Sequence, residues 1–183
     1  MTPEALEQLK YPVGKFTKPE LITASQIQNW TSTIRSFPEA VATLTRPLSR
    51  TELNWQYRPG GWTIKQVVHH CADSHMNSLM RFKLALTEES PTIRPYHEDR
   101  WAELSDSLDD EINNALDLLN GLHGKWVKLI SALSSADLQR TFVHPEHGQS
   151  FTLAETIGTY DWHCRHHLTH IQLALVHKGS FDL

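Results

Sequence analysis

Four stretches of this chain repeat apolar residues at spacings of three and four, which is the pattern of a helix with one buried face. They cover residues 23–44, 63–86, 107–133 and 153–178. Thr23 or Ser25 can cap the first helix and Thr63 the second, whereas Pro38 should kink the first helix or divide it in two. In the third stretch the predicted buried face begins at Leu108. The pattern therefore predicts four long amphipathic helices.

The segments between these helices are rich in proline, glycine and polar residues. Prolines and a glycine in residues 1–22 predict an extended arm, rather than a helix, that packs along the body. Residues 48–62 predict a polar connection with a turn at 58–61. Residues 87–104 contain two prolines and predict a long crossover loop that lies over the mouth of a site.

Residues 134–152 predict a short helical turn at 135–137 and then a turn or hairpin at 144–148, with His144 and His147 exposed. Strand-like alternation is scarce elsewhere. Together the elements predict an all-α fold, a four-helix bundle with one long crossover loop and an extended N-terminal arm. The length is typical of a single domain, which would span residues 1–183.

Composition excludes several classes of protein. Hydrophobic residues make up 39% and charged residues 21% of the chain, which is typical of a folded globular protein rather than a disordered one. A net charge of −4 without a basic cluster argues against a nucleic-acid partner. No apolar run suits a membrane span and the N-terminus lacks the features of a signal peptide, so we expect a cytoplasmic protein. Cys71 and Cys164 are too few for a disulfide framework and are interpreted as small core residues.

The chain has twelve histidines, and they concentrate in two of the predicted helices. In the last helix, His163 with His167, or His166 with His170, are four residues apart and can present two imidazoles to one divalent ion. At about 100° per residue, His167 and His163 lie about 60° and about 100° from the centre of the apolar stripe. His170 lies about 120° away and His166 about 160°. The pair His163 and His167 therefore flanks the core, and His166 is expected to face water.

A third ligand has to come from another helix, because two imidazoles do not make a metal site. In the second helix His75 lies at the middle of the apolar stripe, and His70 flanks that stripe by about 120°. Either can be the third ligand, and His75 can equally be a hydrogen-bonded core histidine. Asp73 could orient an imidazole, although a solvated carboxylate on the helix surface is the simpler interpretation.

Several long motifs support a family resemblance. They are Tyr-Pro-Val-Gly at 11–14, the segment 60–83 with Val-Val-His-His in it, the loop 87–96, and Tyr-Asp-Trp-His followed by His-His-Leu-Thr-His-Ile in 160–171. These motifs resemble the YfiT proteins of the DinB/YfiT superfamily, and the resemblance covers nearly the whole chain. It implies a four-helix bundle and a homodimer. It also implies a divalent ion, Zn²⁺ or Ni²⁺, held by His70, His163 and His167.

Three neutral imidazoles with an open coordination position can lower the pKa of a bound water to near 7 and so activate it for hydrolysis. The resemblance accordingly implies a metal-dependent hydrolase. The same open position can deprotonate a thiol. Since superfamily relatives include bacillithiol-type S-transferases and a mycothiol-dependent isomerase, a low-molecular-weight-thiol S-transferase is the alternative. A third possibility is a non-enzymatic metal-bound dimerisation module.

The sequence does not identify the other residues of such a site. Asp73, His75 and Glu155 are candidates for a general base, and spacing distinguishes none of them. Arg81, Arg94 and Tyr96 are candidate contacts for a small-molecule substrate such as a low-molecular-weight thiol. For the loop residues Arg94, Tyr96 and Trp101, simple loop packing is the simpler interpretation.

Overall fold

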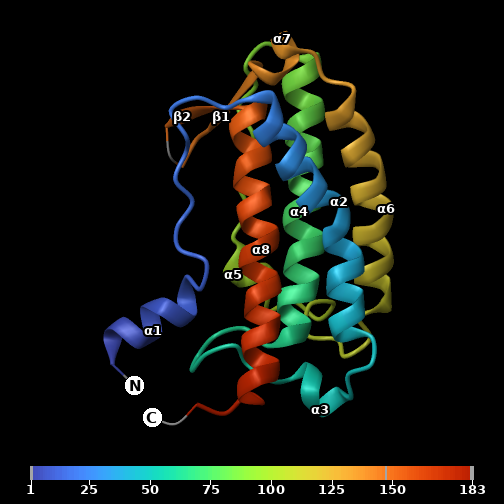
Figure 1. Ribbon diagram of the computed structural model, residues 1–183. Coiled ribbons are helices and arrows are strands. Elements are labelled where there is room, and N and C mark those ends of the chain that lie inside the picture. The colour runs from blue at the N-terminus through green and yellow to red at the C-terminus, as the bar shows by residue number, and fades with distance from the viewer. Residues whose placement is uncertain (1, 147, 182–183) are drawn as a thin grey trace.

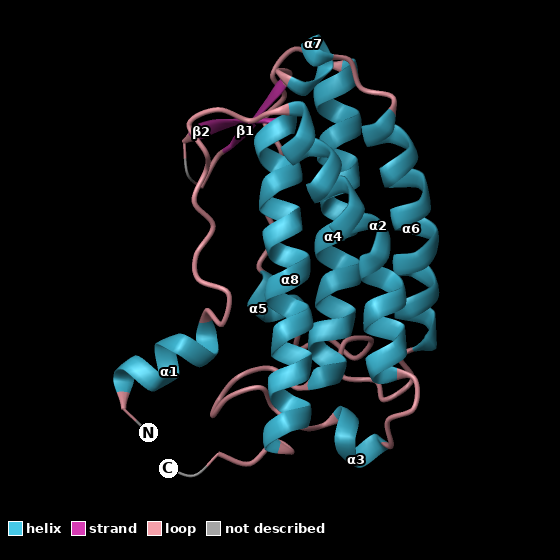
Figure 2. Cartoon of the chain, viewed as in Figure 1, coloured by secondary structure: helices cyan, strands magenta, loops and turns pink. Residues whose placement is uncertain are grey.

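The computed structural model describes residues 2–146 and 148–181, and within them four long helices run side by side (Figure 1). These helices are α2 (Ala24–Thr45), α4 (Ile64–Thr87), α6 (Asn113–Ser131) and α8 (Leu153–His177). The short helix α1 (Pro3–Lys10) precedes them, as Figure 2 shows. The connections between them contain α3 (Arg50–Leu53), α5 (Glu98–Trp101), α7 (Ser135–Leu138), β1 (Thr141–His144) and β2 (Gln149–Thr152). The predicted all-α four-helix bundle is confirmed.

The four helices form a closed square. Helix α2 packs against α8 and α6, and α4 packs against the same two neighbours. In Figure 1, α2 and α8 descend while α4 and α6 ascend, so the chain must return the length of the bundle between α4 and α6. The predicted crossover loop makes this return and carries α5. It is fixed at one end to the hairpin, where the Ile93 amide donates to the Val143 carbonyl at 3.0 Å.

Capping residues define where three of the four long helices begin. Thr23 and Thr63 each form a capping box with a glutamine three residues later, and Thr152 caps α8 by accepting from the Glu155 amide. Helix α2 continues through Pro38, so of the two predicted alternatives, a kink or a division into two helices, the division is wrong. Pro38 is buried in the bundle, and packing of this apolar helix face outweighs the lost hydrogen bond.

The third predicted helix begins six residues later than expected, at Asn113 rather than at 107. Local hydrogen bonds compete with the helix before that point. The Asp109 carboxylate accepts from the Glu111 amide at 3.0 Å, and the Glu111 carboxylate accepts from the Asn113 amide at 3.0 Å. Leu108 is therefore outside the helix and exposed, not part of the buried face.

The N-terminal arm contains a helix, which corrects the prediction of an entirely extended arm. Thr2 caps α1 and Pro3 occupies its first turn, where a proline costs no helical hydrogen bond. The remainder of the arm is extended and lies beside α8 (Figure 1). The Trp162 indole of α8 donates to the Gly14 carbonyl at 2.8 Å, and Lys18 pairs with Glu155 at 2.9 Å.

The remaining connections agree in part with the predictions. The polar connection 48–62 contains α3, and its Leu53 and Tyr57 are buried. The predicted turn at 135–137 is α7, and the predicted hairpin pairs Thr141 with Thr152 in an antiparallel register. His144 is half-buried on β1 rather than exposed, because its ring packs against Phe151, and the prediction for His147 lies outside the described residues.

Two further observations concern the whole of the described chain. None of its helices combines the length and the apolar character that crossing a bilayer requires. Cys71 and Cys164 are both buried and unbridged, and burial raises the pKa of each thiol, so they are core residues as predicted.

Candidate metal centre

Three histidines converge where α4 packs against α8. His70 comes from α4, and His163 and His167 come from successive turns of α8. One ring nitrogen from each lies within 4.8 Å of the others. The Nε2 atoms of His70 and His163 are 3.3 Å apart. The structure thus brings together the three residues that the resemblance implies as ligands.

This arrangement fits a divalent ion. Two nitrogens bound to one tetrahedral zinc at 2.0–2.1 Å are about 3.3 Å apart, which matches the 3.3 Å between the Nε2 atoms of His70 and His163. Burial lowers the pKa of His70 to about 3 and holds the pKa of His163 and of His167 well below the ordinary value. All three rings are therefore neutral at pH 7, the form in which imidazole binds a metal.

His75 lies behind this cluster rather than in it. Its ring is fully buried in the core, and its Nε2 is 3.0 Å from the Nδ1 of His163. Its Nδ1 is 2.6 Å from the Nε2 of His123 on α6, whose Nδ1 is 2.6 Å from the Ile34 carbonyl of α2. Of the two roles that periodicity left open for His75, the structure favours the hydrogen-bonded core histidine.

The expectation that His166 faces water is wrong. The residue is 7% exposed, because the N-terminal arm lies over this side of α8. Its ring stacks on Trp162 and lies 6.0 Å from the ring of Tyr11. Helical angles locate a residue relative to its own helix, whereas the arm that covers His166 comes from a distant part of the sequence.

His170 is buried in the same region, and its ring stacks on Tyr57 with a centroid separation of 3.7 Å. Its Nδ1 is 3.4 Å from the Nδ1 of His167, and its Nε2 is 3.3 Å from the Lys10 carbonyl. With His166 and His167 it forms a second group of three nearby imidazoles. His167 belongs to both groups, so the two cannot be treated as independent sites.

A cavity of about 410 Å³ opens beside the three predicted ligands. Its lining includes aromatic rings from Tyr11, Tyr57, Trp62 and Trp162, and charged groups from Lys10, Arg58 and Glu98. The Trp62 ring packs against His70 at 4.6 Å. The crossover loop contributes Glu98, which supports its predicted place at the mouth of a site.

Among the described residues that line this cavity, Glu98 is the acidic one, and sequence reasoning missed it. It is exposed at the rim, and partial loss of hydration together with the nearby carboxylates of Asp99 and Glu146 raises its pKa. Four acidic residues fall within 98–106 without any distinguishing pattern, so spacing could not have selected one. The only available signal was the position of the loop.

The predicted candidates for a general base lie elsewhere. Glu155 pairs with Lys18, and neither Glu155 nor Asp73 lines the cavity. Arg81, Arg94 and Tyr96, the candidate substrate contacts, line a different cavity of about 250 Å³ with Trp101. None of the three lines the cavity beside the three histidines.

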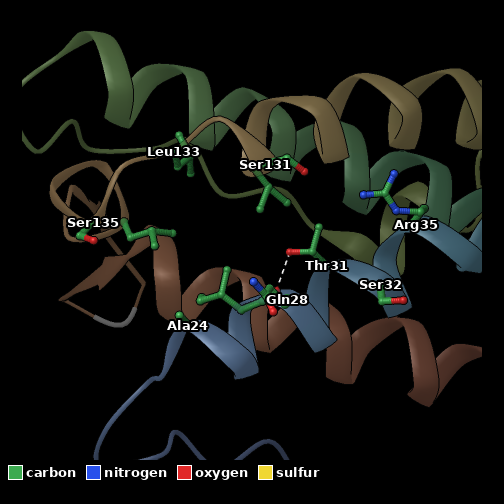
Figure 3. Close-up of a pocket in the computed structure, with 11 residues that line it drawn as sticks. Ala24, Gln28, Thr31, Ser32, Arg35, Ser131, Leu133 and Ser135 are labelled. Atoms are coloured by element: carbon green, nitrogen blue, oxygen red, sulfur yellow. Dashed lines mark hydrogen bonds between the residues drawn. The ribbon is translucent and has the colours of Figure 1, made fainter.

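A further cavity, of about 570 Å³, lies between α2 and the end of α6 (Figure 3). Thr31, Ser131 and Arg35 contribute polar groups to it, and the Thr31 hydroxyl donates to the Ile27 carbonyl at 2.6 Å. Among the described residues that line it, there is no histidine, cysteine or carboxylate. Its lining thus offers no conventional metal-binding side chain.

Known proteins resemble the chain over most of its length. Residues 28–171 match the DinB superfamily. Two proteins named "Putative metal-dependent hydrolase", from Bacillus mycoides (strain KBAB4) and Bacillus cereus (strain B4264), are each 48% identical over 166 residues. Those alignments cover 91% of this chain and 95% of each relative.

A solved structure resembles the fold described above. It is that of YfiT from Bacillus subtilis, described as "a probable metal-dependent hydrolase with an unusual four-helix bundle topology". It is 41% identical, covers 95% of this chain and 99% of its own, and superposes with a TM-score of 0.91. By sequence and by fold, the chain belongs to the DinB superfamily.

Proposed function

We propose that this protein is a metal-dependent hydrolase whose ion is held by His70, His163 and His167. The observation that carries the proposal is the convergence of three neutral imidazoles in the lining of an accessible cavity. The names of the relatives support it. Zn²⁺ is the expected ion and Ni²⁺ the alternative, since sites of three histidines accept several first-row metals. When bound, such an ion supplies a Lewis acid that lowers the pKa of a water or thiol ligand.

Glu98 is proposed as the residue that accepts a proton during hydrolysis. It lines the same cavity as the three histidines, and its raised pKa lies closer to neutrality than that of an ordinary glutamate. A general base favours hydrolysis over thiol transfer, because thiol activation by an ion needs no separate proton acceptor.

The cavity also suits a small substrate that carries an anionic group. Lys10 and Arg58 line it, and the Nε of Arg58 is buried without a hydrogen-bond partner. A carboxylate or phosphate would satisfy that donor with a charge-assisted hydrogen bond. This feature suits an anionic low-molecular-weight thiol equally well, which keeps S-transfer as the second candidate.

The first test is a screen of zinc-loaded protein against small anionic esters, amides and phosphate esters. We expect hydrolysis, and we expect Glu98→Gln to lower kcat by about 10²–10⁴-fold while the bound metal remains unchanged. The exposed residue Glu103 of the same loop gives a matched control, Glu103→Gln, which should retain activity. Full activity in Glu98→Gln would contradict the role of Glu98.

A second measurement separates the two chemistries. Small thiols are titrated into cobalt-substituted protein, and the absorption spectrum is followed. We expect no sulfur-to-metal charge-transfer band at millimolar thiol. An intense band that His163→Ala abolishes, in a protein that hydrolyses none of the substrates above, would contradict the hydrolase and establish the S-transferase in its place.

A further inference from the structure

A continuous line of imidazoles runs from the predicted ligand His163 through the core. The Nδ1 of His163 meets the Nε2 of His75 at 3.0 Å, and the Nδ1 of His75 meets the Nε2 of His123 at 2.6 Å. The Nδ1 of His123 then meets the main-chain carbonyl of Ile34 at 2.6 Å. Because these residues belong to α8, α4, α6 and α2, the line touches all four long helices of the bundle (Figure 1).

The carbonyl at the end of this line fixes the direction of every hydrogen bond in it. A carbonyl oxygen can only accept, so the Nδ1 of His123 carries the proton and its Nε2 is bare. That bare nitrogen accepts from the Nδ1–H of His75, which leaves the Nε2 of His75 bare to accept from His163. His163 is then protonated at Nδ1, and its Nε2 presents a lone pair to the metal site.

This reasoning requires neutral rings, and the surroundings provide for them. His75 and His123 are at most 1% exposed. The ring of Phe37 packs against both, at 5.3 Å and 5.7 Å, and Trp126 covers them from another side. An unpaired positive charge in these apolar surroundings would cost roughly several kcal/mol, so the rings of His75 and His123 each carry one proton.

A shorter line of hydrogen-bonded groups lies behind His167, the second predicted ligand on α8. The Nε2 of His170 lies 3.3 Å from the Lys10 carbonyl, and its Nδ1 lies 3.4 Å from the Nδ1 of His167. By the same logic His170 donates from Nε2, accepts at Nδ1 from His167, and leaves the Nε2 of His167 bare. The two lines of hydrogen bonds therefore favour the same tautomer, with a bare Nε2, for both His163 and His167.

We propose that His75, His123 and His170 are positioning residues, which impose on His163 and His167 the tautomer with a bare Nε2 before any ion arrives. This inference rests on the proposed metal centre. It accounts for much of the excess of histidine, since three imidazoles that bind no ion are needed to orient two that do. It also locks the ligand rings, because a flipped ring would turn a carbon toward its partner and leave a buried nitrogen unpaired.

The arrangement disfavours a second ion among His166, His167 and His170. Because the first ion would take the Nε2 of His167, a second ion would need its Nδ1, whereas the line through His170 uses that atom as a donor. A protein that bound two ions per chain, and lost the second in His166→Ala, would overturn the assignment for His167.

The direct test reads the tautomers in the full-length protein after a chelator has removed metal. Imidazole ¹⁵N chemical shifts distinguish a bare nitrogen from a protonated one. We expect His163 and His167 to be protonated at Nδ1 and bare at Nε2 at neutral pH. A protonated Nε2 on either ring would overturn the proposal for that ligand, whether or not the protein proves to be a hydrolase.

Substitutions provide the second test, with zinc affinity measured by competition against a chelator. His75→Leu removes the acceptor for His163, and we expect it to weaken zinc binding by about 10–100-fold. His75→Gln can accept through Oε1 near the position of Nε2, so we expect it to restore most of the affinity. His69→Leu, six residues earlier and on another face of α4, is the matched control and should bind zinc as the wild type does.

Circular dichroism of each metal-free variant shows whether the fold is retained. Equal zinc affinity in wild type, His75→Leu and His75→Gln would overturn the proposal, as would equal weakening in the two variants. If the wild-type protein bound no metal at His70, His163 and His167, that result would instead contradict the proposed function. The tautomers of His163 and His167 could still be measured in that case.

Discussion

Burial determines the protonation state of most polar side chains around the candidate site. It lowers the pKa of His123 and of His166 to about 4, and it raises the pKa of Asp73 to about 6 with a further contribution from the charge of Asp106. Neutral forms are thus favoured at these positions. Neutral imidazoles are useful to a metal site, whereas the carboxylate of Asp73 lies outside the cavity and has no comparable role.

Asp73→Asn should stabilise the fold at high pH. The native pKa of Asp73 is raised from 3.8 to about 6, so the unfolded chain loses its proton more readily and the charged form is destabilising. A shift of this size corresponds to about 3 kcal/mol in full, and partial hydration of the side chain reduces our expectation to about 1–2 kcal/mol at pH 8.

This advantage should shrink as the pH falls through 6 and vanish below about 4, where both states are protonated. Urea unfolding of the two metal-free proteins at pH 8, 6 and 4 measures the difference. An advantage that did not depend on pH would contradict the assigned pKa.

Single residues were predicted with mixed success, for physical reasons. The buried roles of Cys71, Cys164 and His75 follow from their places on apolar stripes. The burial of His166 and the contribution of Glu98 could not follow from periodicity, because the N-terminal arm and the crossover loop determine them. Both segments meet the site only through the tertiary fold.

Close contact between α2 and α8 depends on a glycine. A β-carbon on Gly158 of α8 would lie 2.9–3.2 Å from ring atoms of Trp30 on α2, closer than carbon atoms pack. The absence of a side chain therefore allows the two helices to approach, and this contact helps to orient the helix that carries His163 and His167.

Gly158→Ala should destabilise the protein by about 1–3 kcal/mol through overpacking. Gly121→Ala on α6 is the matched control, because a β-carbon there meets nothing within 4 Å. That control should be up to about 1 kcal/mol more stable than wild type, from helix propensity alone. Thermal unfolding of both variants measures the contrast, and equal effects would contradict the close contact.

The long helices were predictable because amphipathic periodicity and capping residues agree at their starts. Thr63 and its capping box coincide with the onset of the apolar stripe of α4. The errors occurred where local hydrogen bonds outweigh periodicity. Hydrogen bonds to the Asp109 and Glu111 carboxylates delay the start of α6. Thr2 and Pro3 start a helix in an N-terminal arm whose later prolines had predicted an extended chain.

At the scale of the whole molecule, the site is a product of the complete bundle. The proposed ligands come from α4 and α8, and the hydrogen bonds behind His163 reach α6 and α2. The arm closes the other side through Lys10 and Gly14, and the crossover loop supplies Glu98. In a protein built in this way, the order of the core determines the geometry of the candidate metal centre.

The set of three ligands could be named from the sequence only through the family resemblance, because helical angles left His70 and His75 open. The structure brings His70 to His163 and His167 and leaves His75 behind them. The expected homodimer stays a prediction, which sedimentation equilibrium can test.

Metal stoichiometry tests the central claim most directly. Wild type, His70→Ala, His163→Ala and His167→Ala are saturated with Zn²⁺, freed of excess ion by gel filtration and analysed by mass spectrometry for zinc per chain. His177→Ala, an exposed histidine on the same helix α8, is the control. We expect one ion per chain in wild type and in the control, and loss of most of the metal in each ligand variant with helical content retained. Full zinc stoichiometry in His163→Ala would contradict the account.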